Sequence, residues 1–165
     1  MTHNELTWKF LNEFDVESST QAKARAISLE HGVNVISPAV GAQLALVAAA
    51  TNATNIIEIG TGLGLSGLWL LAGAPEATLT SIDPEFEYHE QARELFTEAG
   101  YPASRVRLIT GKALDVLPRM NENSYDDLME LVELYPEHVI EFSATEGEVG
   151  LIRGRNHVVW EVRLY

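Results

Sequence analysis

The chain of 165 residues contains no cysteine. It can therefore form no disulfide and no thiolate metal site, and it lacks the usual compositional sign of secretion. Basic residues are also scarce, since 11 Lys and Arg stand against 24 Asp and Glu and give a formal net charge of −13. A chain this acidic repels phosphate backbones and anionic lipid, so we expect neither nucleic acid nor a membrane surface as a partner.

Long apolar runs are absent as well. The longest one, residues 44–50, is far too short to span a bilayer. The first residues show no basic start followed by an apolar segment, so no signal peptide is expected. These absences predict a soluble, cytoplasmic protein, and the apolar content of 46% suffices for one folded domain.

Apolar residues at helical spacing predict two helices before residue 32. The second carries an apolar stripe of Ala22, Ala26 and Leu29, and the SST sequence at residues 18–20 separates the two and can cap the second. A third helix is predicted to begin at the Ser-Pro pair of residues 37 and 38 and to run to residue 50. This helix is apolar nearly all round, so we expect it to be buried.

The pattern changes after the third helix. Strands are predicted over residues 56–59, 78–82 and 105–109, and helices over 65–71 and 84–99, with glycines and prolines between them. Strands and helices of these lengths in alternation predict parallel βαβ units with right-handed crossovers. The fold class predicted is therefore α/β, a Rossmann-like domain with a mainly parallel sheet and N-terminal helices.

The most informative segment reads EIGTGLGLSG over residues 58–67. It follows a predicted strand and opens a predicted helix. Glycines there allow a tight turn and let a ligand approach the backbone without interference from Cβ atoms. The start of the helix offers free N–H groups to an anionic group. That group is pyrophosphate in a dinucleotide site and can be the methionine carboxylate in an S-adenosylmethionine site.

Asp83 lies nineteen positions after Gly64, at the end of the next predicted strand. An acid at that place can accept hydrogen bonds from ribose hydroxyls. The pattern fits NAD as well as S-adenosylmethionine, and a purely structural role is a third alternative, in which Asp83 caps the helix that Pro84 begins. Glu58, two residues before Gly60, and the long helical segment before the first strand favour S-adenosylmethionine.

Four segments together carry a family resemblance. They are SPAVG at residues 37–41, IEIGTGLGLSG at 57–67, LTSID at 79–83 and RLITGKALDVLP at 107–118. In order and spacing they resemble the actinobacterial O-methyltransferases related to the catechol and caffeoyl-CoA O-methyltransferases, over roughly residues 5–126. The resemblance implies a class I methyltransferase fold, S-adenosylmethionine as methyl donor and an oxygen of a small molecule as acceptor, and it makes a homodimer plausible.

The resemblance also implies where the cofactor binds. Glu58, Gly60, Gly62 and Ser66 would surround the methionine end of the cofactor. Ser66 would place its hydroxyl near the carboxylate, Asp83 would bind the ribose, and Ala113 would line the adenine pocket. Ser37 would belong to a segment that closes over the sulfonium. The implied cofactor-binding residues are Ser37, Glu58, Gly60, Thr61, Gly62, Gly64, Ser66, Asp83, Gly111 and Ala113.

The resemblance fails after Tyr125. Members of the family that use a metal carry an Asp-x-Asp motif after the fourth strand and an Asp-Asn pair after a later one, and neither is recognisable beyond Asp126. We therefore assign no metal ligand and no catalytic base, and a divalent metal is doubtful. A non-catalytic module that binds S-adenosylmethionine or S-adenosylhomocysteine is the alternative to a methyltransferase, and an NAD-dependent oxidoreductase is the second alternative.

The last part of the chain differs in composition. Residues 122–148 contain nine acidic residues and neither Lys nor Arg. A helix is predicted over 126–135, a strand over 139–142 and a hairpin from 149–152 and 157–164.

These changes divide the chain into residues 1–125, a helical segment plus the cofactor-binding core, and residues 126–165, a divergent acidic tail. The tail belongs to the same domain or is a fused segment. Three origins stay open: a shortened completion of the sheet, the loss of a central block from the gene, or a fusion. In each case the sheet is expected to be incomplete or altered at its C-terminal end.

Overall fold

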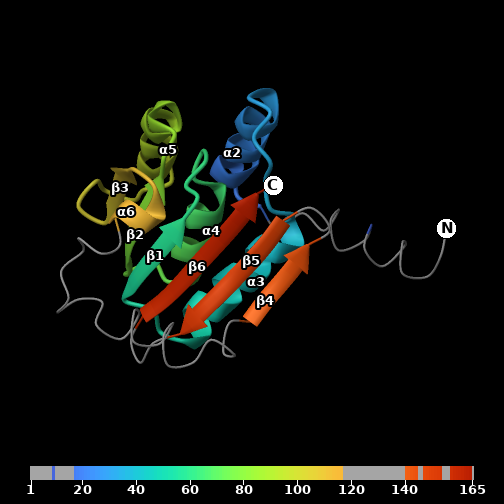
Figure 1. The fold of residues 1–165 in the computed structure, drawn as a ribbon, viewed down its shortest axis with the longest axis vertical. Helices are drawn as coiled ribbons and strands as arrows, with labels where there is room; N and C mark the ends of the chain where they lie inside the picture. Colours follow the sequence, from blue (N-terminus) through green and yellow to red (C-terminus); the bar gives the residue numbers. More distant parts are fainter. Residues whose placement is uncertain (1–8, 10–16, 117–139, 145–146, 154–156, 165) are drawn as a thin grey trace.

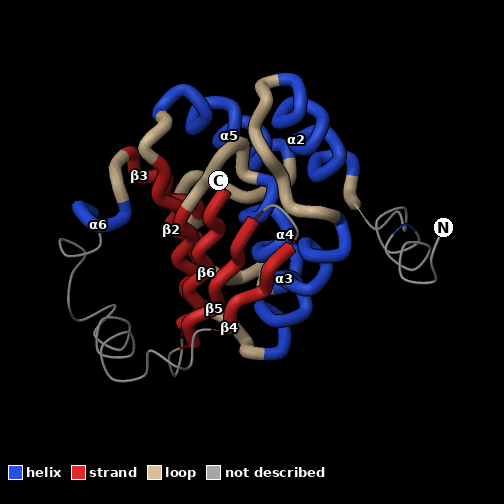
Figure 2. The backbone as a smooth tube through the Cα atoms, turned by 45° about the vertical axis from the view of Figure 1, so that its right-hand side comes forward, coloured by secondary structure: helices blue, strands red, loops and turns tan. Residues whose placement is uncertain are grey.

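The computed structural model describes residue 9 and residues 17–116, 140–144, 147–153 and 157–164. Within these ranges one six-stranded sheet runs through the molecule, and helices α3 and α4 lie to one side of it (Figures 1 and 2). The helix predicted over residues 126–135 lies outside the described residues, as does nearly all of the first predicted helix.

The sheet has the strand order β3-β2-β1-β6-β5-β4 (Figure 1). The strands are β1 (Asn55–Ile59), β2 (Thr78–Asp83), β3 (Val106–Thr110), β4 (Ile140–Ala144), β5 (Gly147–Arg153) and β6 (His157–Leu164). β1 pairs in parallel with β2 and with β6, and β2 pairs in parallel with β3. The predicted α/β class with parallel βαβ units is therefore confirmed.

The C-terminal strands enter the same sheet as the rest. β5 is antiparallel to both β4 and β6, so the predicted hairpin is present. The strand beside β1 on the side away from β2 is the last strand of the chain, with Glu58 in register with Trp160. A fourth parallel strand thus exists, but it is contributed by residues 157–164 and not by the chain that directly follows β3.

Two of the N-terminal helices begin at serine caps, as the sequence predicts. α2 (Ser19–Glu30) starts with a capping box in which the Ser18 hydroxyl accepts a hydrogen bond from the amide of Gln21, while the Gln21 side chain accepts one from the amide of Ser18. α3 (Pro38–Ala50) has Ser37 as its cap, whose hydroxyl accepts from the amide of Val40 at 3.3 Å. These bonds satisfy amides that a helix start leaves without a partner.

The face that α2 buries is not the apolar stripe that the sequence suggests. Ala22, Ala26 and Leu29 are exposed, and the buried residues are Thr20, Gln21, Ala24 and Ser28. This face contacts α4 and α5, and the hydroxyl of the buried Ser28 donates a hydrogen bond to the carbonyl of Ala24. The buried face of α2 is therefore the one that contacts other helices, although it is not the most apolar face.

α3 is also less buried than its composition suggests. Only one face, with Gly41, Leu44 and Ala48, is buried, whereas Leu46 is 67% exposed. That face lies against α4 (Leu65–Gly73), where a Cβ on Gly73 would come within 2.0 Å of the carbonyl oxygen of Ala45. Glycine at this position lets the two backbones approach closely.

α5 (Phe86–Glu98) and the short α6 (Ala113–Val116) complete the described helices. The apolar core brings α3, α4, α5 and the first two strands together around Leu70, Leu79 and Phe96, each at most 1% exposed. Among the described residues, none of the helices combines the length and the hydropathy that a bilayer crossing requires.

Candidate functional site

The loops that follow β1, β2 and β3 meet at one edge of the sheet. The amide of Gly60 donates a hydrogen bond to the carbonyl of Ile82 at 2.8 Å, and the amide of Gly111 donates one to the carbonyl of Asp83 at 3.0 Å. The carboxyl ends of parallel strands form this edge, which is where open α/β sheets bind their ligands.

The loop between β1 and α4 turns sharply through glycines with positive φ. Gly62 has φ +48°, and a Cβ placed there would point across the loop to Val33, 3.5 Å away. Gly64 has φ +85°, and a Cβ there would lie 2.9 Å from the ring of Phe96 in α5. Gly62 thus leaves room beside the loop, and Gly64 lets α5 pack against the start of α4.

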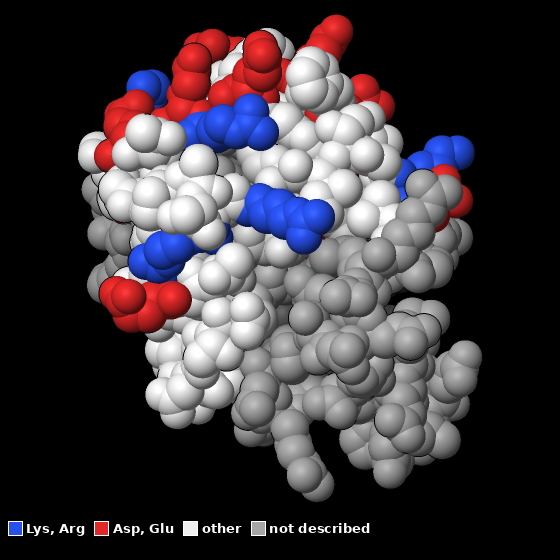
Figure 3. Space-filling model, turned by 90° about the vertical axis from the view of Figure 1, so that its left-hand side faces the viewer, with Lys and Arg blue, Asp and Glu red and all other residues white. Residues whose placement is uncertain are grey.

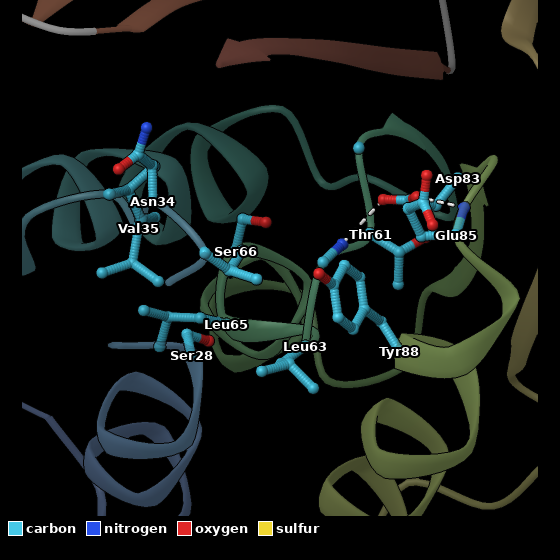
Figure 4. Close-up of a pocket in the computed structure, with 14 residues that line it drawn as sticks. Ser28, Asn34, Val35, Thr61, Leu63, Leu65, Ser66, Asp83, Glu85 and Tyr88 are labelled. Carbon is cyan, nitrogen blue, oxygen red and sulfur yellow. Dashed lines mark hydrogen bonds between the residues drawn. The ribbon is translucent and has the colours of Figure 1, made fainter. Parts of the chain in front are cut away.

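Asp83 joins this loop to the start of the next helix. Its Oδ2 accepts a hydrogen bond from the amide of Gly62 at 2.9 Å, and its Oδ1 accepts one from the amide of Glu85 at 2.8 Å (Figure 4). The second contact closes a turn just before α5, which begins at Phe86 and not at the predicted Pro84. Asp83 therefore combines a structural role with a place beside the loop.

Glu58 lies fully buried beneath the loop. Its Oε1 accepts a hydrogen bond from Ser66 at 2.5 Å and its Oε2 accepts one from Ser81 at 2.6 Å, while the hydroxyls of Ser81 and Thr61 are 2.7 Å apart. Burial raises the pKa of the Glu58 carboxyl to about 7; the bonds from the two serines lower it, and the Asp83 carboxylate raises it.

A cavity of about 180 Å³ opens beside the glycine loop (Figure 4). Three parts of the chain surround it: the loop with the first turn of α4, the β2–α5 connection with the first turn of α5, and α2 with the segment after it. Its lining residues are Ser28, Val33, Asn34, Val35, Ile36, Gly60, Thr61, Gly62, Leu63, Leu65, Ser66, Asp83, Glu85 and Tyr88.

The structure brings half of the predicted site residues together in this cavity. Gly60, Thr61, Gly62, Ser66 and Asp83 line it. Gly64 lies behind the loop against Phe96, and Glu58 lies under it.

Besides Gly64 and Glu58, three other predicted residues lie outside the lining of this cavity. Ser37 caps α3 and immediately follows the lining segment Val33–Ile36. Gly111 is bound to the end of β2 through its amide, and Ala113 begins α6. Their contacts with a cofactor stay predictions.

The segment Val33–Ile36 and Tyr88 are site residues that the sequence pattern does not reveal. Arg25 of α2 holds this segment in place, because its Nη1 donates to the carbonyl of Ile36 at 2.7 Å while its Nε and Nη2 bind the carboxylate of Glu17 at 2.9 and 2.6 Å. The only local signal is the position of the segment just before the Ser-Pro pair.

No group of three or more metal-binding side chains gathers among the described residues. Asp126 and Asp127, at the point where the resemblance ends, lie outside them. The lining of the cavity offers hydroxyls, backbone amides and the carboxylates of Asp83 and Glu85 to a ligand.

The α/β sheet, the glycine loop and the acid at the end of β2 together form a Rossmann-type domain, of the kind that commonly binds nucleoside cofactors. The model of the O-methyltransferase family matches residues 16–133. The chain belongs to this family, as the sequence resemblance predicts.

Individual relatives agree with the family. One relative is a protein from Mycobacterium sp. (strain KMS) that is named as an O-methyltransferase. It is 47% identical over 111 residues, which are 67% of this chain and 50% of the relative. A crystal structure from Corynebacterium glutamicum superposes with a TM-score of 0.66 at 35% identity, covering 73% of this chain and 57% of the other.

A third relative contains the expected cofactor. The O-methyltransferase TomG from Streptomyces achromogenes, solved in complex with S-adenosylmethionine, superposes with a TM-score of 0.64 at 30% identity over 73% of this chain and 57% of TomG. The chain spans about half the length of the curated relatives it matches. Family membership favours the methyltransferase interpretation over the NAD alternative.

Proposed function

We propose that this chain binds S-adenosylmethionine beside the glycine loop and transfers its methyl group to an oxygen of a small acceptor. The observation that supports this most strongly is the shared cavity: the loop from Gly60 to Ser66 and the carboxylate of Asp83 border one open space. The complex of TomG with S-adenosylmethionine supports the same cofactor.

The residues around the cavity suit the methionine end of this cofactor. Gly64 provides no side-chain cap for α4, so the first amides of that helix are available to a carboxylate. The absence of a Cβ on Gly62 keeps the space toward Val33 open. We assign Ser66 to the carboxylate, with Thr61 and Gly60 alongside.

The remaining predicted contacts extend from the loop toward β3. We assign Asp83 to the ribose, because it lies between the glycine loop and the start of α5. Gly111 and Ala113 follow β3 and are assigned to the adenine, and the chain before Ser37 is assigned to the sulfonium side. In this arrangement the cofactor lies along the carboxyl ends of β1, β2 and β3.

When bound, the sulfonium of S-adenosylmethionine supplies an electrophilic methyl group. The described residues contribute by holding the cofactor and by fixing the direction in which an acceptor can approach, which is the larger part of catalysis in such a transfer. We assign no base and no metal ligand, and a divalent metal is doubtful.

The proposed partner is a small molecule and not a polymer or a membrane. Acidic side chains gather at the α5 end of the described surface (Figure 3), where α5 carries Glu87, Glu90, Glu94 and Glu98. This charge disfavours binding to nucleic acid or anionic lipid. We further propose a cytoplasmic location and a homodimer, the latter from the family resemblance.

Calorimetric titration of the full chain with S-adenosylhomocysteine and, separately, with NAD tests the cofactor. Binding of the first and not of the second is expected, and no heat with S-adenosylhomocysteine overturns the proposal. A methyl-transfer assay on catechol, with and without added Mg²⁺, then tests the reaction. Binding without any turnover would support the non-catalytic alternative.

A further inference from the structure

Four side chains form a continuous hydrogen-bonded chain beneath the glycine loop. It runs from Ser66 to Glu58, from Glu58 to Ser81 and from Ser81 to Thr61, with separations of 2.5, 2.6 and 2.7 Å. Glu58 and Ser81 are fully buried, whereas the two ends of the chain, Ser66 and Thr61, line the cavity. The protonation state of Glu58 therefore determines how the hydroxyls of two cavity-lining residues are hydrogen-bonded.

The directions of these bonds depend on the protonation of Glu58. An ionised carboxylate only accepts, so Ser66 and Ser81 must both donate to it. Ser81 has then used its single proton, so Thr61 must donate to Ser81. Three hydroxyl protons fill three bonds, and the ends of the chain present only acceptor lone pairs to the cavity.

Protonation of Glu58 changes which hydrogen-bonding groups are available in the cavity. If protonated Glu58 donates to Ser66, the hydroxyl proton of Ser66 becomes free to point into the cavity. If it donates to Ser81, that serine donates to Thr61, and the proton of Thr61 becomes free instead. By either route three of the four protons are used in the three bonds of the chain. The fourth is left free and provides one new hydrogen-bond donor to the ligand.

We propose that this loop binds the carboxylate of its ligand with uptake of one proton at Glu58. A carboxylate needs donors, and with Glu58 ionised the hydroxyl of Ser66 cannot supply one. The inference rests on the proposed function, because it takes the ligand to be an amino-acid nucleoside whose carboxylate lies at Ser66. It makes Glu58 a positioning residue that acts through the two hydroxyls.

The surroundings of Glu58 favour proton uptake near neutral pH. Its pKa of about 7 is raised by burial and by Asp83, the charged group of β2. α4 and the segment Val33–Ile36 carry no charged residue. On β6, Trp160 is in register with Glu58, and the nearest charged position, Glu161, is in register with Ile59.

Titration calorimetry of the full chain with S-adenosylhomocysteine tests the proposal. At pH 8 the titration is run in two buffers of different ionisation enthalpy, so that the difference in heat counts the protons taken up. We expect uptake approaching one proton. The affinity should fall by about tenfold from pH 6 to pH 8, which is the change in the protonated fraction of a group with a pKa of about 7.

Two controls make the result specific. 5′-Methylthioadenosine lacks the amino-acid part, and its affinity should not change over the same pH range. The Glu58→Gln variant has an NH2 group that donates and a carbonyl oxygen that accepts, so it mimics the protonated side chain. It should bind S-adenosylhomocysteine at pH 8 as tightly as the wild type does at pH 6, without taking up a proton.

The outcomes separate this inference from the proposed function. No binding of S-adenosylhomocysteine at any pH refutes both. Binding with no proton uptake and an affinity independent of pH refutes the coupling alone, as does an affinity that rises with pH, which would place the ammonium group at the hydroxyls. The wild-type titration decides the question even if Glu58→Gln fails to fold.

Discussion

The carboxylate of Asp83 accepts a hydrogen bond from the backbone amide of Gly62 at 2.9 Å, across 21 positions of sequence. This bond ties the end of β2 to the loop that follows β1. Because the other oxygen of Asp83 holds the amide of Glu85, a single side chain fixes both the loop and the entry to α5. A variant at this position therefore tests the binding site and its support together.

Replacing Asp83 with alanine should weaken S-adenosylhomocysteine binding by about 1–3 kcal/mol, the usual loss when a buried hydrogen-bonding partner is removed. Asp83→Asn retains an oxygen that can accept from Gly62 and should fall between the alanine variant and the wild type. Calorimetric affinities of the three proteins decide the point. An unchanged affinity for Asp83→Ala would leave this residue with only a structural role at the entry to α5.

Gly62→Ala should weaken cofactor binding, because the new Cβ would point toward Val33 and narrow the cavity. The matched control is Gly100→Ala, since Gly100 also has a positive φ, of +89°, but no atom lies within 4 Å of the Cβ position. Both variants should lose roughly 1–2 kcal/mol of stability from backbone strain. Thermal unfolding measures the loss of stability in both variants. Calorimetry measures their affinity for S-adenosylhomocysteine, which only Gly62→Ala should change. Equal affinities of the two variants would contradict a ligand beside Gly62.

The strands and the glycine loop could be predicted because their signals are local. β-branched residues mark β1, and the spacing from Gly64 to Asp83 follows from the length of one βαβ crossover. These features placed Gly60, Thr61 and Asp83 at one edge of the sheet, and the structure places them around one cavity.

The parts that could not be predicted depend on contacts between distant segments. Val33–Ile36 has no periodicity of its own and reaches the cavity because Arg25 binds the carbonyl of Ile36. α2 buries Thr20, Gln21 and Ser28, and not Leu29, because the buried face is the one that contacts α4 and α5 and not the most apolar one. The place of β6 beside β1 is equally non-local, since strand order is not encoded in any one strand.

Arg25→Lys should release the segment Val33–Ile36 and lower both stability and affinity. Lysine cannot replace the planar guanidinium that binds the Ile36 carbonyl and the Glu17 carboxylate together. The expected loss of stability is about 1–2 kcal/mol. Lys23→Ala is the control on the same helix: it removes an exposed ion pair with Glu98 and should cost no more than about 0.5 kcal/mol. Urea unfolding and calorimetric affinity check both, and equal effects of the two variants would exclude a positioning role for Arg25.

Glu58 should make the stability of the free protein fall as the pH rises. Its pKa is about 7 in the folded protein against 4.5 for an unperturbed carboxyl, so the folded state holds the proton more tightly. The resulting stabilisation is present below about pH 4.5 and is lost as the pH rises through about 7. Its upper bound is about 3–4 kcal/mol, from roughly 1.4 kcal/mol per pKa unit over the shift from 4.5 to about 7.

Glu58→Gln removes this titration. From pH 5 to pH 8 the wild type should therefore lose unfolding free energy relative to the variant. Urea unfolding at both pH values measures the shift. Glu94→Gln, in which an exposed carboxylate of α5 is neutralised, provides the baseline for the loss of one charge. A difference for Glu58→Gln that stays constant with pH, like the baseline, would mean that Glu58 remains ionised in the folded protein. The hydrogen-bonded chain would then present only acceptors to the cavity at every pH tested, because its three hydroxyl protons would all be committed to its three internal bonds.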